Sequence, residues 1–298
     1  MTHDGTPSFG IKTTPANVGY DDILRVWREA DTIPEIGHAW LYDHLVPYVG
    51  GRIVDASGPV HEGWTLLTAL AVQTRRLRFG LMVTNNRLRP PAVLAKMAAT
   101  LDVISGGRLD LGIGVGGLPD AAAVAPEYDG YGIPLVPWRA AVAALGEACT
   151  VIRRLWTEDV FDFAGRHYRL TGARCSPKPV QRPHPPILIG GSGTATLRVV
   201  AEHADVWNAI GPPVNPVEHL VRRAAVLDEL CAEIGRDPAG ITRSVQLPVS
   251  YDDPASARES LRRLREAGFS HFVLNLPSPY PPGAASWAAE ELIGPVRG

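Results

Sequence analysis

The chain has 298 residues, of which 45% are hydrophobic and 20% are charged, and its formal net charge is −2. This composition is typical of a globular protein, and the length allows one large α/β domain or two smaller ones. No block of like charge favours nucleic acid or a membrane surface as a partner, and no apolar run approaches the roughly 18 residues of a membrane span. The polar amino terminus, residues 1–8, lacks the apolar core of a secretion signal, so we expect a cytoplasmic protein.

Strand-like and helix-like segments alternate along the chain. Short apolar runs predict eight strands, at residues 9–13, 39–42, 77–83, 109–113, 187–189, 206–210, 241–249 and 272–276. Amphipathic patterns predict eight helices, at residues 21–33, 64–73, 91–104, 138–156, 194–203, 216–234, 254–267 and 286–293. Eight strand-then-helix units predict an α/β fold of the (β/α)8 TIM-barrel type, with a doubly wound sheet as the competitor. The first strand lacks a G-x-G-x-x-G fingerprint, which favours the barrel.

One segment interrupts this alternation in the second half of the chain. Residues 158–185 hold several aromatic residues around Gly165, followed by a proline-rich stretch. We predict a small β-excursion or lid at residues 157–185, inserted into a single domain that spans residues 1–298. No low-complexity tract or linker divides the chain into two domains.

Cysteine and histidine spacings argue against a disulfide framework and against a metal site. Cys149, Cys175 and Cys231 are odd in number and widely spaced. Two of them fall in helical patterns, where a cysteine packs as a small apolar residue. The histidines show no metal-ligand spacing such as H-E-x-x-H. We therefore expect no bound metal.

A buried strand that ends at Ile189 runs into a glycine-rich turn. The turn consists of Gly190, Gly191, Ser192 and Gly193, and a helical pattern follows directly. Backbone N–H groups at such a turn approach a ligand closely, and the helix dipole favours an anion at the same point. The motif predicts a phosphate cradle, although glycine at a strand-to-helix turn also has a purely geometric explanation.

Polar residues and glycines also follow the other predicted strands. Active sites of (β/α)8 barrels lie at the carboxyl ends of the strands. In chain order, the residues at these ends are Thr13 and Thr14, Asp43 and His44, Thr84 to Asn86, Gly114 to Gly117, and Asn208. Their convergence predicts one pocket that is built from several strands.

Five segments, in this order along the chain, resemble the luciferase-like superfamily of flavin and deazaflavin oxidoreductases. They are residues 40–45, 62–71, 77–80, 91–101 with 106–114, and the cradle with 204–208. The resemblance covers most of the chain and implies a (β/α)8 barrel with an insertion in its second half. It is strongest for the branch that uses coenzyme F420, an 8-hydroxy-5-deazaflavin, because Asp43-His44 after the second strand is typical of that branch.

The resemblance also implies roles for individual residues. His44 is the first candidate for catalysis, because a histidine can exchange a proton near neutral pH; a loop histidine that bonds only the backbone is the alternative. Met82 and Val83 match the place where the family has a non-prolyl cis peptide, which forms a bulge behind the cofactor ring. The other implied cofactor contacts are Asp43 beside His44, Asn85, Gly116, Asn208, and the cradle residues Gly190, Gly191, Ser192 and Gly193.

The chain departs from the family pattern in two places. Residues 114–117 hold no carboxylate, whereas some deazaflavin dehydrogenases of the family have a glutamate there, so sugar-phosphate dehydrogenation is not expected. Tyr48 stands where tryptophan is common in those enzymes. The loop at residues 118–137, which contains Glu127, either covers the substrate or crosses the surface. Together with residues 158–185 and 277–283, this loop should determine which substrate binds.

These observations lead us to expect an oxidoreductase that transfers hydride between F420 and a small organic substrate. The alternative is an FMN-dependent monooxygenase that uses reduced FMN and dioxygen. A third interpretation is a barrel that has lost catalysis and serves as a binding or structural subunit. Dimers are usual in the family, so we also expect a homodimer.

Overall fold

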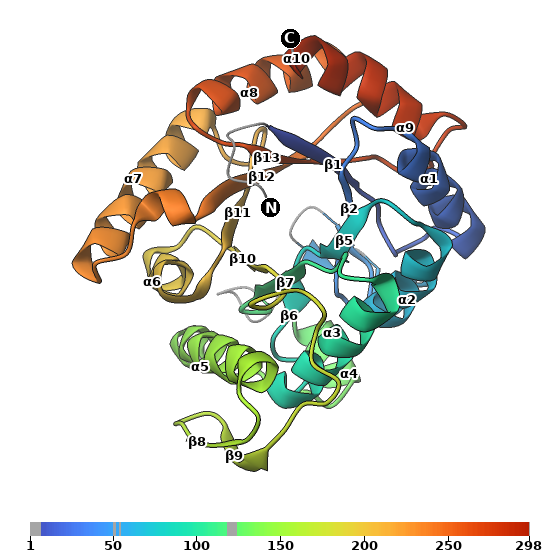
Figure 1. Cartoon of the computed structure of the whole chain (residues 1–298). Helices are drawn as coiled ribbons and strands as arrows, with labels where there is room; N and C mark the ends of the chain where they lie inside the picture. Colours follow the sequence, from blue (N-terminus) through green and yellow to red (C-terminus); the bar gives the residue numbers. More distant parts are fainter. Residues whose placement is uncertain (1–6, 50–51, 54, 118–123, 298) are drawn as a thin grey trace.

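The computed structural model describes residues 7–49, 52–53, 55–117 and 124–297. Parallel strands form a barrel in the centre, and helices surround it (Figure 1). Residues 1–6 of the polar amino terminus lie outside the described residues, as do residues 118–123 of the loop that is expected to influence substrate choice.

The central sheet confirms the predicted (β/α)8 TIM-barrel fold. Nine described strands pair in parallel in the order β5-β2-β1-β13-β12-β11-β10-β7-β6. A parallel bridge between Phe79 and Leu109 joins β5 to the residues before β7, which closes the sheet. The strands are, in chain order, β1 (Ser8–Lys12), β2 (His38–Leu41), β3 (Tyr48–Val49), β4 (Arg52–Ile53), β5 (Arg78–Leu81), β6 (Thr84–Asn85), β7 (Leu111–Gly114), β8 (Phe161–Ala164), β9 (Arg169–Ala173), β10 (Ile187–Gly190), β11 (Val206–Ile210), β12 (Thr242–Pro248) and β13 (His271–Asn275).

The helices cover the barrel with their apolar faces. In the first helix, Ile23, Val26, Trp27 and Ala30 form the buried face, at the spacing of an amphipathic helix. The helices are α1 (Tyr20–Thr32), α2 (Gly63–Gln73), α3 (Pro91–Ser105), α4 (Ala125–Gly130), α5 (Trp138–Thr157), α6 (Thr194–His203), α7 (Val217–Glu233), α8 (Pro254–Glu266), α9 (Ala284–Trp287) and α10 (Gly294–Arg297), with a short 3-10 turn η2 (Pro238–Gly240) and a π-helical segment η3 (Ala288–Ile293).

The third barrel strand is interrupted, whereas the sequence predicts one continuous strand over residues 77–83. β5 ends at Leu81 and β6 begins at Thr84. The peptide bond between Met82 and Val83 is cis, as the resemblance implies. β5 pairs with β2 and β6 pairs with β7, so this bulge lies at the point where the chain passes from one strand pair to the next.

The segment that was expected to leave the barrel contains an antiparallel hairpin. Its strands, β8 and β9, lie outside the ring of helices beside α5 (Figure 1). Phe161 of β8 is buried against the main core. A smaller antiparallel pair, β3 with β4, follows β2. The sequence pattern does not predict this pair or α4, because both are too short to show a period.

Burial agrees with a parallel barrel that is covered by helices. All four residues of β2 and all four of β7 are buried, as expected for strands with packed layers on both sides. Cys149, Cys175 and Cys231 are buried free thiols. In the part of the chain that the structure describes, no helix combines the length and apolar character required to cross a membrane.

Candidate functional site

Most of the predicted site residues line one cavity of about 290 Å³ at the carboxyl ends of the strands. The cavity lies between the end of β2, the Met82–Val83 bulge, the end of β7 and the glycine-rich turn after β10. The predicted residues that line it are Asp43, His44, Val83, Asn85, Gly116, Gly190, Gly191, Ser192 and Gly193. Four strands that are distant in sequence thus contribute to one pocket, at the end of the barrel where active sites lie.

A buried carboxylate holds His44 in the cavity wall. The Nδ1 atom of His44 lies 3.1 and 3.0 Å from the two carboxylate oxygens of Glu127 in α4. Glu127 also accepts the backbone N–H of Leu45 over 2.6 Å and is fully buried. Because a carboxylate only accepts hydrogen bonds, Nδ1 of His44 carries the hydrogen. Nε2 is therefore the ring atom that can gain or release a proton.

Aromatic rings pack around His44 and restrict its orientation. The His44 ring stacks on Tyr48, with ring centroids 4.0 Å apart and an interplanar angle of 8°. The Tyr42 ring meets the His44 ring edge-on, with the ring centroids 5.6 Å apart. Burial, and secondly the charge of Glu127, raise the pKa of Tyr48, so its phenol is neutral near neutral pH. His44 thus sits between two neutral rings and one buried carboxylate.

Asp43 anchors the end of β2 through an ion pair. Its two oxygens accept hydrogen bonds from Arg89 over 2.7 and 3.0 Å, and one of them also accepts the backbone N–H of Asn85. Arg89 also contacts Glu62, which caps the amino terminus of α2. A buried carboxylate requires such partners. These bonds join β2 to β6, and a cofactor contact by Asp43 stays a prediction.

Asn85 and Gly116 shape another part of the cavity wall. The Asn85 amide donates to the Tyr128 hydroxyl over 2.8 Å and accepts the backbone N–H of Arg87 over 3.0 Å. Gly116 has a φ of +76°, and a Cβ there would lie 1.8 Å from Oδ1 of Asn85. Glycine is therefore required at this position for both conformation and space. Asn85 already has protein partners at both amide atoms, so its contact with a cofactor ring stays a prediction.

Two glycines make room for the side chain of Val83. A Cβ at Gly114 would lie 2.5 Å from Cγ2 of Val83, and a Cβ at Gly190 would lie 2.9 Å from its Cγ1. Side chains at either position would displace Val83, which lines the cavity. The two glycines thus let Val83 present an apolar surface in the cavity wall, which fits packing against a flat ring.

The glycine-rich turn leads into an uncapped helix. Gly193 is the N-cap of α6, and no side chain accepts a hydrogen bond from the first turn of this helix. The Gly191 N–H is already bound to the carbonyl of Asn208 over 3.0 Å. The donors that remain for an anion are thus the amides from Ser192 onward and the Ser192 hydroxyl. Free N–H groups at a helix amino terminus, in a glycine-lined cavity, fit a phosphate group.

Two predicted residues do not line the cavity. Met82 is 2% exposed and its side chain packs in a small core cluster with Trp40. Asn208 in β11 donates to Ser244 over 2.8 Å and accepts from Gln246 over 3.1 Å, inside the barrel. Their cofactor contacts stay predictions.

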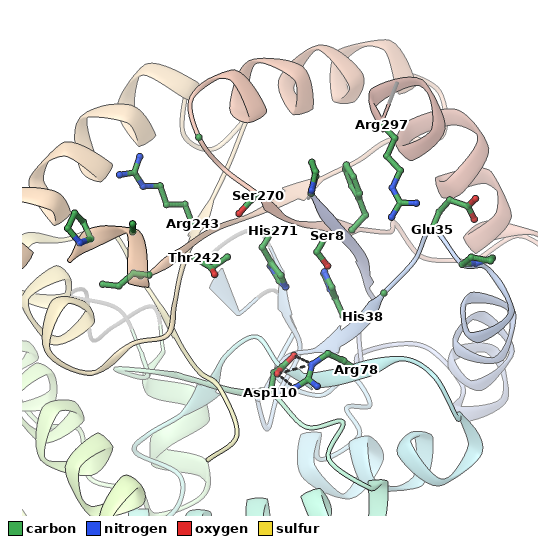
Figure 2. Close-up of a pocket in the computed structure, with 18 of the residues that line it drawn as sticks. Ser8, Glu35, His38, Arg78, Asp110, Thr242, Arg243, Ser270, His271 and Arg297 are labelled. Carbon is green, nitrogen blue, oxygen red and sulfur yellow. Dashed lines mark hydrogen bonds and ion pairs between the residues drawn. The ribbon is translucent and has the colours of Figure 1, made fainter. Parts of the chain in front are cut away.

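A larger cavity of about 870 Å³ lies at the opposite end of the barrel, at the amino ends of the strands. Figure 2 shows the ion pair of Arg78 with Asp110 and the side chains of His38 and His271 facing this cavity. The two imidazoles stack with centroids 4.1 Å apart. Because no residue of the predicted site lines it and active sites of this fold lie at the other end, we place the site in the smaller cavity.

Sequence reasoning did not identify Glu127 as the partner of His44. The two residues are separated by 83 positions, and Glu127 lies in a six-residue helix without a recognisable pattern. The Arg89 partner of Asp43 was missed for the same reason, because pairs this distant in sequence are set by the fold.

Comparisons with known proteins agree with the fold. The family model described as luciferase-like monooxygenase matches residues 8–291. An uncharacterized protein of Mycobacterium tuberculosis is 31% identical over 255 residues, which cover 85% of this chain and 81% of that protein.

Solved structures share the same fold at lower identity. An F420-dependent secondary alcohol dehydrogenase in complex with an F420-acetone adduct has a TM-score of 0.81 and 19% identity, over 98% of this chain and 99% of that chain. The coenzyme F420 dependent tetrahydromethanopterin reductase of Methanopyrus kandleri has a TM-score of 0.75 and 19% identity, over 97% of this chain and 99% of that chain. The monooxygenase RslO1 of Streptomyces bottropensis has a TM-score of 0.73 and 22% identity, over 96% and 98%. On the match of the family model, the chain belongs to the luciferase-like monooxygenase family of oxidoreductases.

Proposed function

We propose that the chain is an F420-dependent oxidoreductase that transfers hydride between the deazaflavin and a small organic substrate. The observation that carries the proposal is the His44–Glu127 pair in the wall of a cavity that ends in the glycine cradle. When bound, the deazaflavin supplies a carbon that accepts or donates hydride. The chain supplies binding, orientation and a group that exchanges a proton.

The residues of the cavity fit a cofactor that has a ring at one end and a phosphate at the other. The amides from Ser192 onward, with the Ser192 hydroxyl, would hold the phosphate at the amino terminus of α6. Gly114 and Gly190 leave room for Val83, whose side chain would pack against the ring. These contacts use backbone groups and small residues, which leave the polar side chains of the site for the substrate.

His44 would hold or release the proton that accompanies hydride transfer. Glu127 accepts the hydrogen at Nδ1, which fixes the tautomer and leaves Nε2 for exchange. Tyr48 stacks on the ring and keeps water from that face. An oriented imidazole of this kind typically contributes about 10²- to 10⁴-fold to a rate.

An FMN-dependent monooxygenase is the competing function, because FMN carries the same ribityl phosphate and a ring of similar shape. The fold is shared with a monooxygenase as well as with F420-dependent enzymes. We favour the deazaflavin because Asp43-His44 after the second strand is typical of the F420 branch. The proposal also keeps a small organic substrate, a cytoplasmic location and a homodimeric assembly, which rest on the sequence alone.

Oxygen consumption separates the two functions. Reduced FMN is mixed with the protein in air, and oxygen uptake is compared with that of reduced FMN alone and with that of reduced FMN and the His44→Ala variant. The proposal predicts that the protein adds no His44-dependent uptake. Oxygen uptake that requires both the protein and His44 would identify a monooxygenase.

A further inference from the structure

Lys12, the last residue of β1, carries a charge that no carboxylate neutralises. Its Nζ donates to Oε1 of Gln246 over 2.7 Å and lies 5.8 Å from the ring centroid of Tyr42. An ammonium group has three donors. Among the residues that the structure describes, none of the ion pairs includes Lys12. By contrast, Lys96 and Lys178 donate to backbone carbonyls away from the barrel mouth.

The surroundings of Lys12 do not compensate for this charge. Burial alone lowers the pKa of Lys12 to about 8, so the side chain is still mostly an ammonium near neutral pH. Burial raises the pKa of Tyr42, so its phenol is neutral. The Tyr42 hydroxyl is hydrogen-bonded to the Thr14 hydroxyl over 2.9 Å. The groups from β12 and β13 that face Lys12 are the neutral amides of Gln246 and Asn275. A desolvated cation without a counter-charge is costly unless a ligand supplies one.

The polar cluster around Lys12 is also incomplete. Asn275 of β13 is the register partner of Lys12 on β1. Its Nδ2 makes only a long contact, 3.4 Å, with Oε1 of Gln246, and its buried Oδ1 has no partner among the described residues. Lys12 nevertheless remains partly exposed to solvent. The hydrogens that Lys12 Nζ and Asn275 Nδ2 still have to donate indicate a place for a ligand that accepts hydrogen bonds.

The cluster lies next to the proposed cofactor cavity without belonging to its wall. Tyr42 contacts Lys12 on one side and His44 on the other. Lys12, Gln246 and Asn275 come from β1, β12 and β13, whereas Val83 and the glycine cradle come from the other side of the barrel. A molecule held by Lys12 would therefore lie at the ring of Tyr42, one side chain away from His44.

We propose that Lys12, with the amide N–H groups of Gln246 and Asn275, binds a carboxylate group of the substrate. The proposal rests on the proposed function, because it assigns a substrate class to the same site. A carboxylate supplies the missing counter-charge and accepts the remaining ammonium hydrogens, in a charge-assisted hydrogen bond. The enzyme would thus act on organic acids in preference to their neutral analogues.

A lysine titration tests this directly, because the chain contains only three lysines, Lys12, Lys96 and Lys178. In protein with carbon-13-labelled lysine, the Cε shift follows the ionisation of each side chain, and Lys12→Gln assigns its signal. Sodium benzoate is the probe and benzamide is its neutral analogue. We expect benzoate to raise the Lys12 pKa by about half a unit or more and benzamide to leave it unchanged, because only an anion favours the ammonium. The signals of Lys96 and Lys178 serve as internal controls.

Calorimetric binding of benzoate then assigns the effect to Lys12. Affinity should fall about tenfold or more in Lys12→Gln and stay within about twofold in Lys96→Gln. Equal effects of benzoate and benzamide, or no response of Lys12 to benzoate, would overturn the proposal and leave only water at the cluster. If Lys12→Gln does not fold, Lys96→Gln and Lys178→Gln assign the other two signals, and the titration of the wild-type chain still decides. Cofactor affinity is measured separately, so tight FMN binding with an intact benzoate response would refute the F420 assignment alone.

Discussion

The imidazole of His44 and the carboxylate of Glu127 lie 3.0 Å apart, although 83 residues separate them along the chain. Glu127 is fully buried, and its other described partner is the N–H of Leu45. A carboxylate is stable in such a place only when it is paired. The short helix α4 and the end of β2 therefore depend on each other, and the pair gives the cavity a histidine of defined tautomer.

The substitution Glu127→Gln should reduce turnover without abolishing cofactor binding. Glutamine keeps the shape and can still accept the Leu45 N–H, but it removes the negative charge beside His44. We expect kcat to fall about tenfold or more while the cofactor Kd changes little, because a glutamine amide can also donate to Nδ1 and no longer fixes the His44 tautomer. Steady-state kinetics with the cofactor Kd measured alongside check this. Unchanged kcat would leave Glu127 with a structural role only.

The substitution His44→Ala should separate chemistry from binding. Because the glycine cradle and the Val83 surface are unchanged, we expect the affinity for the cofactor to stay within about tenfold, while turnover falls about 10²-fold or more. Equilibrium titration and steady-state kinetics on the same preparation measure both quantities. Tyr48→Phe keeps the stacked ring and serves as a control that should retain most turnover. Full activity in His44→Ala would refute the catalytic role.

The bounds of a strand or helix were predictable where a turn or a polar residue ends an apolar run. The prediction for β11 at residues 206–210 and for α6 at residues 194–203 matches the observed bounds, because glycine turns and polar residues bound these apolar runs. The third strand was predicted as continuous, yet it breaks at Val83. Its residues remain apolar across the break, so no period in the sequence marks it.

The site was predictable to the extent that it lies at strand ends. His44, Asn85 and Gly190 were expected there because parallel strands direct their carboxyl ends to one edge. Partners from loops and helices were not predictable in the same way. Glu127 comes from α4 and Arg89 precedes α3, and only tertiary structure brings them to the strand ends.

The substitution Gly114→Ala should weaken cofactor binding by displacing Val83 in the cavity wall. The new Cβ would lie 2.5 Å from Val83 Cγ2, and overpacking of this kind typically costs about 1–3 kcal/mol. We expect a loss of affinity of about tenfold, measured by fluorescence titration, and partial recovery when Val83→Ala is added. Gly240→Ala, with no atom within 4 Å of the new Cβ, is the control. Equal affinity in the two alanine variants would contradict the assigned ring surface.

The stacked pair of His38 and His271 should make the protein sensitive to acid. Burial, and secondly the charge of Arg78, lower the pKa of His271 from 6.5 to about 3; burial, and secondly the charge of His271, lower the pKa of His38. At a pH between the ordinary pKa of 6.5 and the lowered pKa in the folded chain, each histidine is protonated in the unfolded chain and neutral in the folded one. The free energy of unfolding therefore falls as the pH falls below 6.5. Each histidine contributes at most about 1.4 kcal/mol per pH unit.

Urea unfolding at several pH values checks this dependence. The free energy of unfolding of His271→Asn should change less with pH than that of the wild-type chain between pH 6.5 and 4. Gly240→Ala, which alters no titratable group, should leave the slope unchanged. Equal slopes for all three proteins would show that other groups cause the acid sensitivity.

The central claim is that this cavity binds a deazaflavin, and a parallel calorimetric titration with oxidised F420 and with FMN tests it most directly. The account predicts saturable F420 binding at least about tenfold tighter than that of FMN, which corresponds to about 1.4 kcal/mol, and F420 binding about tenfold weaker in Gly114→Ala. Tighter binding of FMN would contradict the account and would assign the chain to the flavin-dependent monooxygenases of its family.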